Sequence, residues 1–321
     1  MDNFLSTESN LPFVSVVLPV LNAEKTIGQV LQILAEQTYP AENYEIIVVD
    51  NGSSDRSLQI ITKFPVKLLH ETRFPNSYCA RNQGVLQARG DIIVFVDADC
   101  IPEKDWLEIL VRPFHDDSIG IVAGEVLSSH QSNLIQRFYD FSGLLMQRHK
   151  VSHKAAAIGA GNVAFRTEIF VSVGLFDENF RWGGDNDFGR RVQEQTSYSI
   201  KFEPKALVYH YHRESLKALI KHAYTYGLGK GRYKLKYTDT GRINDFFSEF
   251  VLFLRLTAGI SLIPLHILKI YKSGRPLRES IVFSFLDKTF CLIEQIGKLI
   301  FILTKSDLLF RRQSCRENIL P

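Results

Sequence analysis

The stretch DIIVFVDADC, residues 91–100, joins an apolar run to two carboxylates one residue apart, Asp97 and Asp99. The five apolar residues before them predict a buried strand. Because side chains alternate along an extended chain, both carboxylates are expected on the same side of it. Two such carboxylates repel each other unless a cation lies between them, and Mg²⁺ or Mn²⁺ takes oxygen ligands of this kind. The alternative is a strand end with two solvated aspartates.

Length and composition are those of a globular protein. The chain has 321 residues, of which 45% are apolar and 23% charged, enough for one large domain or one domain with an appendage. The N-terminal segment is polar and has no signal-peptide pattern, so we expect a cytoplasmic protein. Four scattered cysteines without a CxxC pair argue against disulfides and a cysteine metal site. They are Cys79, Cys100, Cys291 and Cys315.

Charge is divided unevenly along the chain. Residues 1–200 contain 17 Lys and Arg against 25 Asp and Glu, whereas residues 201–321 contain 21 against 10. The net charge of +3 therefore combines an acidic part with a basic one. We expect the basic part to meet an anionic membrane surface or a phosphorylated acceptor. Nucleic acid is not among the expected partners.

Apolar runs alternate with amphipathic segments through the first hundred residues. The runs are too short for helices and predict buried strands at 14–19, 44–49, 66–69 and 91–100. This alternation predicts a parallel sheet wound with helices, whose ligands bind outside the carboxyl ends of the strands. Asp50 and the Asp97–Asp99 pair lie at such ends. No glycine pattern of a P-loop or of the usual dinucleotide fold follows these strands.

Several segments together carry a resemblance to a known family. They are VSVVLPVLN (14–22), EIIVVDNGSSD (45–55) and CARNQGVLQARGDIIVFVDAD (79–99). In this order and spacing they resemble the nucleotide-binding half of the family 2 inverting glycosyltransferases, which have the GT-A fold. The resemblance covers roughly residues 12–235. It implies a Rossmann-like mixed α/β sheet, a nucleoside-diphosphate-sugar donor, and a saccharide or lipid-linked saccharide acceptor.

The resemblance also implies roles for residues of the first half. Asp50 would accept a hydrogen bond from the base of the donor, and Arg81 would help to hold the nucleotide. Asp97 would bind the ribose or the metal, and Asp99 would ligate the Mn²⁺ or Mg²⁺ that bridges the two phosphates. Two alternatives stay open: Asp50 as a turn-forming residue and Arg81 as a solvated helix residue. The residues that would border the nucleoside pocket are Pro19 and Val20.

The second half would supply the acceptor site. Family members carry an acidic sequence that FRWGGDNDFGRR (180–191) resembles, and the alignment puts the catalytic base at Asp185. Gly184 stands where the family often has Glu, which removes one carboxylate from the site. Asp187 is expected to start a helix or to orient the acceptor. Asn162, in the glycine-rich turn GAGNVAFR (159–166), is assigned a donor-side role, with a plain tight turn as the alternative.

An inverting transfer requires one base of this kind. The acceptor hydroxyl attacks the anomeric carbon while the nucleoside diphosphate leaves from the opposite face, and a carboxylate takes the hydroxyl proton. A metal cation offsets the charge that gathers on the diphosphate. Related enzymes place a His where His210 ends a predicted strand, so His210 is expected as a further metal ligand. The alternative is a histidine hydrogen-bonded to backbone.

The rest of the chain is basic and apolar. A helix from Ser215 to Tyr226 is expected, followed by a basic, glycine-rich strip (227–232) that acts as a lid over the diphosphate, contacts a phosphorylated acceptor, or is a flexible linker. Residues 246–270 and 281–303 are long apolar stretches interrupted by charges and, in the first, by proline. We expect amphipathic helices lying in the membrane interface. The alternative is a helical pair packed on the catalytic domain or on a second subunit.

These expectations combine into one hypothesis. Residues 1–235 form a GT-A catalytic domain, with a nucleotide-sugar half (12–127) and an acceptor half (128–235), and residues 236–321 form a helical tail. The protein is expected to be a metal-dependent glycosyltransferase at the inner face of the cell membrane, in surface or exopolysaccharide synthesis. The alternatives are a nucleotidyltransferase and a catalytically silent scaffold of a polysaccharide assembly.

Overall fold

The computed structural model describes residues 11–74, 76–129, 132–144, 146–147, 158–238 and 242–305. The chain divides into two compact units. The first comprises residues 1–130 and 143–212, and the second comprises residues 131–142 and 213–321. The functional boundary expected at residue 235 stays a prediction; that residue lies inside helix α9 (Leu216–Tyr237) of the second unit.

The first unit is built on one mixed sheet. Its described strands follow the order β3-β2-β1-β4-β7-β6-β8-β5. Strands β3, β2, β1 and β4 are parallel, β7 is antiparallel to β4 and β6, β8 is parallel to β6, and β5 is antiparallel to β8. The predicted wound α/β sheet is therefore confirmed. The strand bounds are β1 (Val14–Val20), β2 (Tyr44–Asp50), β3 (Lys67–His70), β4 (Ile92–Val96), β5 (Cys100–Pro102), β6 (Ile119–Ser128), β7 (Asn162–Arg166) and β8 (Ser199–His210).

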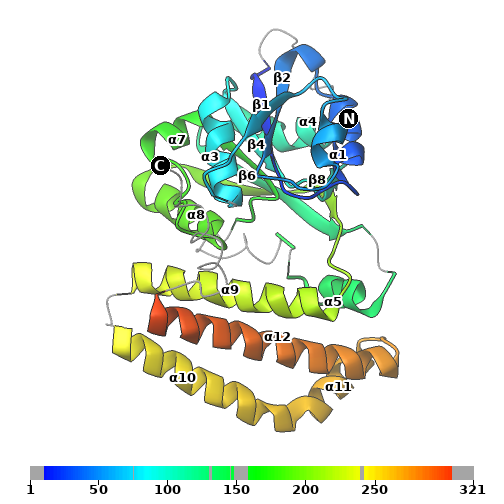
Figure 1. Ribbon diagram of the computed structural model, residues 1–321, viewed down its shortest axis with the longest axis vertical. Coiled ribbons are helices and arrows are strands. Elements are labelled where there is room, and N and C mark those ends of the chain that lie inside the picture. The colour runs from blue at the N-terminus through cyan, green and yellow to red at the C-terminus, as the bar shows by residue number, and fades with distance from the viewer. Residues whose placement is uncertain are drawn as a thin grey trace. The chain divides into compact units, whose positions relative to one another are not determined.

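Helices cover both faces of this sheet. Figure 1 shows α1 and α4 on one side and α3, α7 and α8 on the other. The short helix α2 comes between α1 and α3 in the chain, and the unit also contains two 3-10 turns, η2 and η3. The bounds are α1 (Ile27–Ala35), η2 (Ala41–Asn43), α2 (Ser57–Ile61), α3 (Ser77–Gln87), α4 (Trp106–Val111), η3 (Arg112–His115), α7 (Thr167–Ser172) and α8 (Gly184–Gln195).

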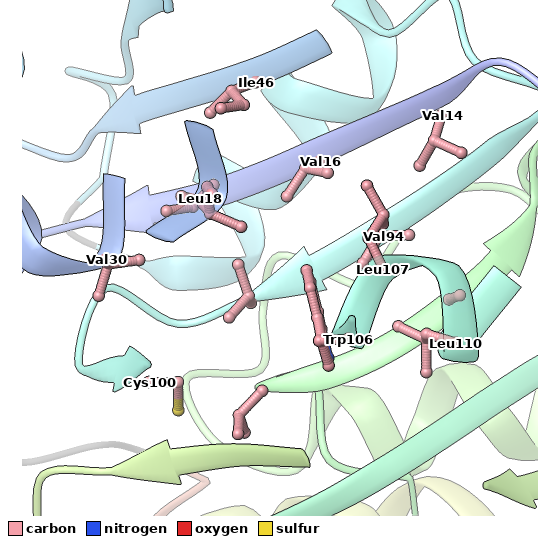
Figure 2. Close-up of a cluster of buried hydrophobic side chains, with 14 of the residues drawn as sticks. Val14, Val16, Leu18, Val30, Ile46, Val94, Cys100, Trp106, Leu107 and Leu110 are labelled. Atoms are coloured by element: carbon pink, nitrogen blue, oxygen red, sulfur yellow. The ribbon is translucent and has the colours of Figure 1, made fainter. Parts of the chain in front are cut away.

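The sheet buries a core on each face because its central strands are apolar at nearly every position. Alternate residues of β1 and β4 point to the α1 and α4 side, where they pack on Trp106 and Leu107 (Figure 2). The other face holds a cluster of phenylalanine rings that includes Phe95, Phe165 and Phe188. A sheet packed on both faces presents only its edges and strand ends to ligands.

The second unit is a set of helices. Figure 1 shows α12 between α9 and the pair α10 and α11, in agreement with its packing against all three. The described helices are α5 (Leu134–Ser142), α9 (Leu216–Tyr237), α10 (Arg242–Ala258), η4 (Gly259–Leu262), α11 (Ile263–Lys272) and α12 (Leu277–Thr304).

The glycine-rich strip is neither a lid nor a linker, because residues 227–232 are helical and lie within α9. A Cβ on Gly227 would lie 1.9 Å from the carbonyl oxygen of Glu294 on α12, and one on Gly297 would lie 2.3 Å from the carbonyl oxygen of Tyr224. Small residues let two helix backbones approach this closely. The glycines therefore serve helix packing, which overrides their low helix propensity.

Helix α10 buries acidic side chains and exposes apolar ones, which reverses the usual polarity of a surface helix. Asp245 and Glu249 are 2% and 6% exposed, whereas Phe247 and Leu254 are 59% and 49% exposed. The helical stretch Ile243–Lys272 is, among the residues described, the one long and apolar enough to cross a membrane by length and composition, and 6% of its apolar window is buried. A run of exposed apolar side chains along one helical stretch is unusual on a soluble protein.

Candidate functional site

The candidate donor residues gather at the carboxyl ends of neighbouring strands. Val20 and Asp50 are register partners at the ends of β1 and β2, and Asp97 follows the end of β4. Pro19 is half-buried and Val20 is buried. The topology thus brings these residues to one edge of the sheet, as expected for parallel strands.

Asp50 is buried and forms a turn. Its carboxylate accepts the backbone N–H of Gly52 at 3.1 Å and that of Ser53 at 3.2 Å, and its exposed fraction is 3%. His70 Nδ1 lies 3.9 Å away. The turn-forming role considered for Asp50 is therefore real. A carboxylate has lone pairs for further donors, so contact with a nucleotide base stays a prediction.

The strand of the DIIVFVDADC stretch is shorter than predicted. β4 ends at Val96, and the N–H of Cys100 donates to the carbonyl of Asp97 at 3.0 Å, which closes a turn. The alternation that was expected to align Asp97 and Asp99 does not apply, because these residues are not extended. The turn gives each carboxylate a partner of its own.

Asp97 is paired with Arg81 of α3. One carboxylate oxygen receives Arg81 Nη2 at 2.5 Å, and the Arg81 side chain is 6% exposed. The alternative of a solvated helix residue at 81 is therefore wrong. The guanidinium lies 5.5 Å from the ring centre of Tyr78, and its Nε is buried without a hydrogen-bond partner. A buried donor without a partner is costly, which marks Arg81 as a group with unused binding capacity.

Asp99 faces His210 of β8. Their closest atoms, Asp99 Oδ2 and His210 Nε2, are 3.4 Å apart, and the Cys100 sulfur completes a group of donors within 4.8 Å of one another. Burial, and then the charges of Asp99 and Asp97, raises the pKa of the Cys100 thiol well above its usual value. Mn²⁺ and Mg²⁺ prefer carboxylate oxygens, whereas thiol sulfur suits softer ions. The donors that fit a divalent cation of the Mn²⁺ kind are therefore Asp99 and His210.

His210 is oriented by a second histidine. His210 Nδ1 lies 3.2 Å from His212 Nδ1, and His212 Nε2 lies 2.6 Å from Ser128 Oγ. If His210 carries its proton on Nδ1, its Nε2 lone pair faces Asp99 and is available to a metal. A ligand histidine is usually held in this way through its other ring nitrogen.

Asp185 lies in the first turn of α8. Its Oδ1 accepts the Tyr78 hydroxyl at 3.2 Å and the N–H of Asn186 at 3.0 Å, and its Oδ2 accepts the N–H of Ala160 at 3.3 Å. The next residue, Gly161, lies against Asp97: a Cβ there would be 2.8 Å from Asp97 Oδ2. The candidate base and the candidate donor carboxylate therefore border the same two-residue turn.

Two of the predicted site residues, Asp187 and Asn162, are buried and hydrogen-bonded within the first unit. Asp187 is fully buried, and Arg191 Nε donates to it at 3.1 Å, as in the helix-start role considered for it. Asn162 is also fully buried: its amide nitrogen binds two strand carbonyls, each at 2.9 Å, and its oxygen accepts Trp106 Nε1 at 2.8 Å. Its hydrogen-bonding groups tie β6, β7, β8 and α4 together. We therefore leave Asn162 out of the proposed site.

Helix α3 is the element that sequence reasoning undervalued. Beyond Arg81, it supplies Tyr78 to Asp185, and Asn76 and Asn82 donate to backbone carbonyls of residues 176–180, which precede α8. Tyr78 and Arg81 are three residues apart, so a helix places them on one face. That spacing was the available signal.

Comparisons with known proteins point to one family of enzymes. A model of the family described as Glycosyl transferase family 2 matches residues 15–173. Glycosyltransferase AglE of Haloferax volcanii is 29% identical over 310 residues, which are 93% of this chain and 99% of AglE. The probable glycosyltransferase YdaM of Bacillus subtilis is 32% identical over 223 residues, which are 64% of this chain but 52% of YdaM.

Solved structures show the same fold. The mannosyltransferase PcManGT from Pyrobaculum calidifontis, solved with GDP-Man and Mn²⁺, superposes with a TM-score of 0.62 at 18% identity, over 93% of this chain and 89% of its own. Glucosyl-3-phosphoglycerate synthase from Mycobacterium tuberculosis, solved with Mg²⁺ and UDP, gives 0.55 at 18% identity, over 72% and 82%. The sheet is the GT-A sheet, and this chain is a glycosyltransferase that belongs to family 2.

Proposed function

We propose that this chain is a metal-dependent inverting glycosyltransferase that moves a sugar from a nucleoside-diphosphate sugar to an acceptor hydroxyl. The observation that carries the proposal is the turn at Ala160 and Gly161, which borders Asp185 on one residue and Asp97 on the next. A base and a donor-side carboxylate next to one another are what a direct displacement requires.

In this proposal Asp185 is the base. Oδ1 is engaged by two donors at 3.0 and 3.2 Å, whereas Oδ2 has one longer bond of 3.3 Å. Oδ2 therefore accepts the acceptor hydroxyl proton as the new bond to the anomeric carbon forms. The bond from that carbon to the diphosphate oxygen breaks at the same time, and the diphosphate leaves with its electron pair. A single carboxylate suffices, because no covalent intermediate forms.

On the donor side, Arg81 holds Asp97 so that it meets the ribose or the metal, and the Arg81 Nε–H remains for an anionic oxygen. Pro19, Val20 and Asp50 line the nucleoside end. Asp99 and His210 would hold the cation, and PcManGT and the synthase, which share the fold, were solved with Mn²⁺ or Mg²⁺. When bound, such a cation offsets the charge on the leaving diphosphate.

The apolar side of α10 and α11 supports a membrane partner. A bilayer-spanning helix would carry Asp245 and Glu249 into lipid, which is expensive. In the second unit both acids instead face Lys234, and the apolar side chains face outward. An interfacial position, with exposed Lys269 and Lys272 near the headgroups, fits this reversed polarity. We infer action at the cytoplasmic face of the cell membrane on a saccharide or lipid-linked saccharide, in surface-polysaccharide synthesis.

The enzyme proposal is tested with purified full-length protein, Mn²⁺ and a panel of sugar nucleotides, by following release of the nucleoside diphosphate. Asp185→Asn is expected to reduce transfer to a small residual rate and to leave donor affinity unchanged in calorimetry. Asp117→Asn, an exposed carboxylate in the same unit, is the matched control and keeps full activity. Absence of turnover with every donor, together with no metal-dependent nucleotide binding, would overturn the proposal.

The membrane proposal has its own test. Wild-type protein should sediment with anionic vesicles and should do so less in high salt. Leu265→Asp, on the exposed apolar side, should reduce sedimentation, whereas Val171→Asp, a more exposed apolar residue of the first unit, should not. Equal sedimentation of both variants would refute the assignment of this surface.

A further inference from the structure

The hydroxyl of the buried Tyr78 is hydrogen-bonded to the start of α8. Its side chain is buried, with 5% exposed, and its hydroxyl accepts the N–H of Gly184 at 3.0 Å and that of Asp185 at 3.4 Å. The same hydroxyl donates to Asp185 Oδ1 at 3.2 Å. One oxygen atom on α3 therefore contacts both the backbone and the carboxylate of the proposed base.

The hydroxyl takes the place of a missing helix cap. The first N–H groups of a helix have no partner within the helix, and the residue before it usually supplies one through its side chain. In α8 that residue is Gly183, which has no side chain and a φ of +75°. Tyr78 supplies the acceptor from a different helix and fixes the first turn of α8, where Asp185 lies.

Gly184 packs directly against the ring of Tyr78. A Cβ at position 184 would lie 2.9 Å from Tyr78 Cε2 and 3.0 Å from Cζ, so no side chain fits there while the ring is present. The ring of Tyr78 thus occupies the space beside the base, and its hydroxyl provides a polar contact to Asp185 in that space.

We propose that Tyr78 is the positioning residue of the catalytic base: it holds Asp185 Oδ1 and the start of α8, so that Oδ2 is directed to the acceptor hydroxyl. The inference rests on the proposed function of Asp185. Burial, and then the charge of Asp185, raises the pKa of Tyr78 well above its usual value, so the hydroxyl keeps its proton and remains a donor at working pH. The Arg81 guanidinium over the ring opposes this shift.

The test is Tyr78→Phe, which keeps the ring under Gly184 and removes the hydroxyl. Loss of one hydrogen bond to a charged group predicts a fall in kcat of about ten- to a hundredfold. The dissociation constant for the nucleoside diphosphate is expected to stay unchanged. The matched control is Tyr39→Phe, because Tyr39 is equally buried and its hydroxyl donates to the Pro12 carbonyl at 2.6 Å. That variant should keep the wild-type kcat.

A double-mutant cycle separates positioning from general damage. If Tyr78 acts through Asp185, Tyr78→Phe lowers the rate of the wild type but not the residual rate of Asp185→Asn. A merely structural role would lower both rates by the same factor, and that result would overturn the inference. The same cycle run on thermal unfolding should show non-additive losses, which provides a readout that does not depend on finding a donor.

The possible failures are distinguishable. A normal rate for Asp185→Asn overturns the base assignment and this inference with it. A normal rate for Tyr78→Phe beside an impaired Asp185→Asn overturns this inference alone. Additive losses in the unfolding cycle also overturn it, whether or not a donor has been identified.

Discussion

Replacing Glu249 by Gln should loosen α10 far more than a surface substitution would. Burial alone would raise the pKa of Glu249, but hydrogen bonds from Gln295, Lys234 and Lys298 outweigh it and lower this pKa from 4.5 to about 2. The closest contacts are 2.6 Å to Lys234 and 2.7 Å to Lys298. Glutamine keeps the shape and loses the charge, so the variant reports the electrostatic part of these contacts.

The magnitude follows from the shift. A change from 4.5 to about 2 is worth about 3 kcal/mol of stability at neutral pH, on the order of a hundredfold in an opening equilibrium. Because the folded-state pKa is depressed, this stabilisation is fully present above pH 4.5 and is lost as the pH falls through about 2. The difference between wild type and Glu249→Gln should therefore shrink to about 1 kcal/mol at pH 3.

Hydrogen–deuterium exchange of α10 peptides measures this local opening. The control is Glu294→Gln, whose partner Lys230 is 53% exposed and whose loss should cost under about 1 kcal/mol. Equal exchange rates in the two variants at pH 7, or a difference that grows on acidification, would refute the electrostatic account of how α10 is held.

Three further outcomes are expected. Gly227→Val should lower the thermal midpoint of unfolding by several degrees, because overpacking against α12 costs about 1–3 kcal/mol. Gly259→Ala, where a Cβ meets nothing within 4 Å, should leave the midpoint unchanged, and equal midpoints for the two variants would contradict the helix contact. His212→Ala should weaken Mn²⁺ binding about 10- to 100-fold in calorimetry, while the exposed His115→Ala has no effect; unchanged affinity would rule out the supporting role of His212. Asn162→Ala should destabilise the protein by about 2–3 kcal/mol in urea unfolding and leave donor KM unchanged; a raised KM at unchanged stability would restore its donor-side role.

The sequence predicts an element best when the side-chain pattern of that element alone decides its structure. The apolar residues at helical spacing in α1, Ile27, Val30, Leu31 and Leu34, are all buried, and the parallel strands follow from their apolar runs. The carboxyl-end rule then brought Asp50 and Asp97 to one edge of the sheet without further information.

Predictions failed where a distant segment decides the local structure. The end of β4 is set by its pairing with β7, whose last register partners are Val96 and Asn162, and no pattern within residues 91–100 reveals it. Gly227 is helical because α12 lies against it. Asn162 was assigned a donor-side role, with a tight turn as the alternative, yet its amide donates to strands that are not adjacent to it in sequence. Contacts of this kind are not encoded in local spacing.

Helix α3 joins Arg81, which holds Asp97, to Tyr78, which holds Asp185, and this sets a limit on how the chain can vary in length. One inserted residue between positions 78 and 81 would turn these side chains by about 100° relative to each other. Both carboxylates cannot then keep their partners. Insertions in the loops on either side of α3 carry no such penalty. We therefore expect length variation among functional versions of this enzyme to fall in those loops and never inside the helix between Tyr78 and Arg81.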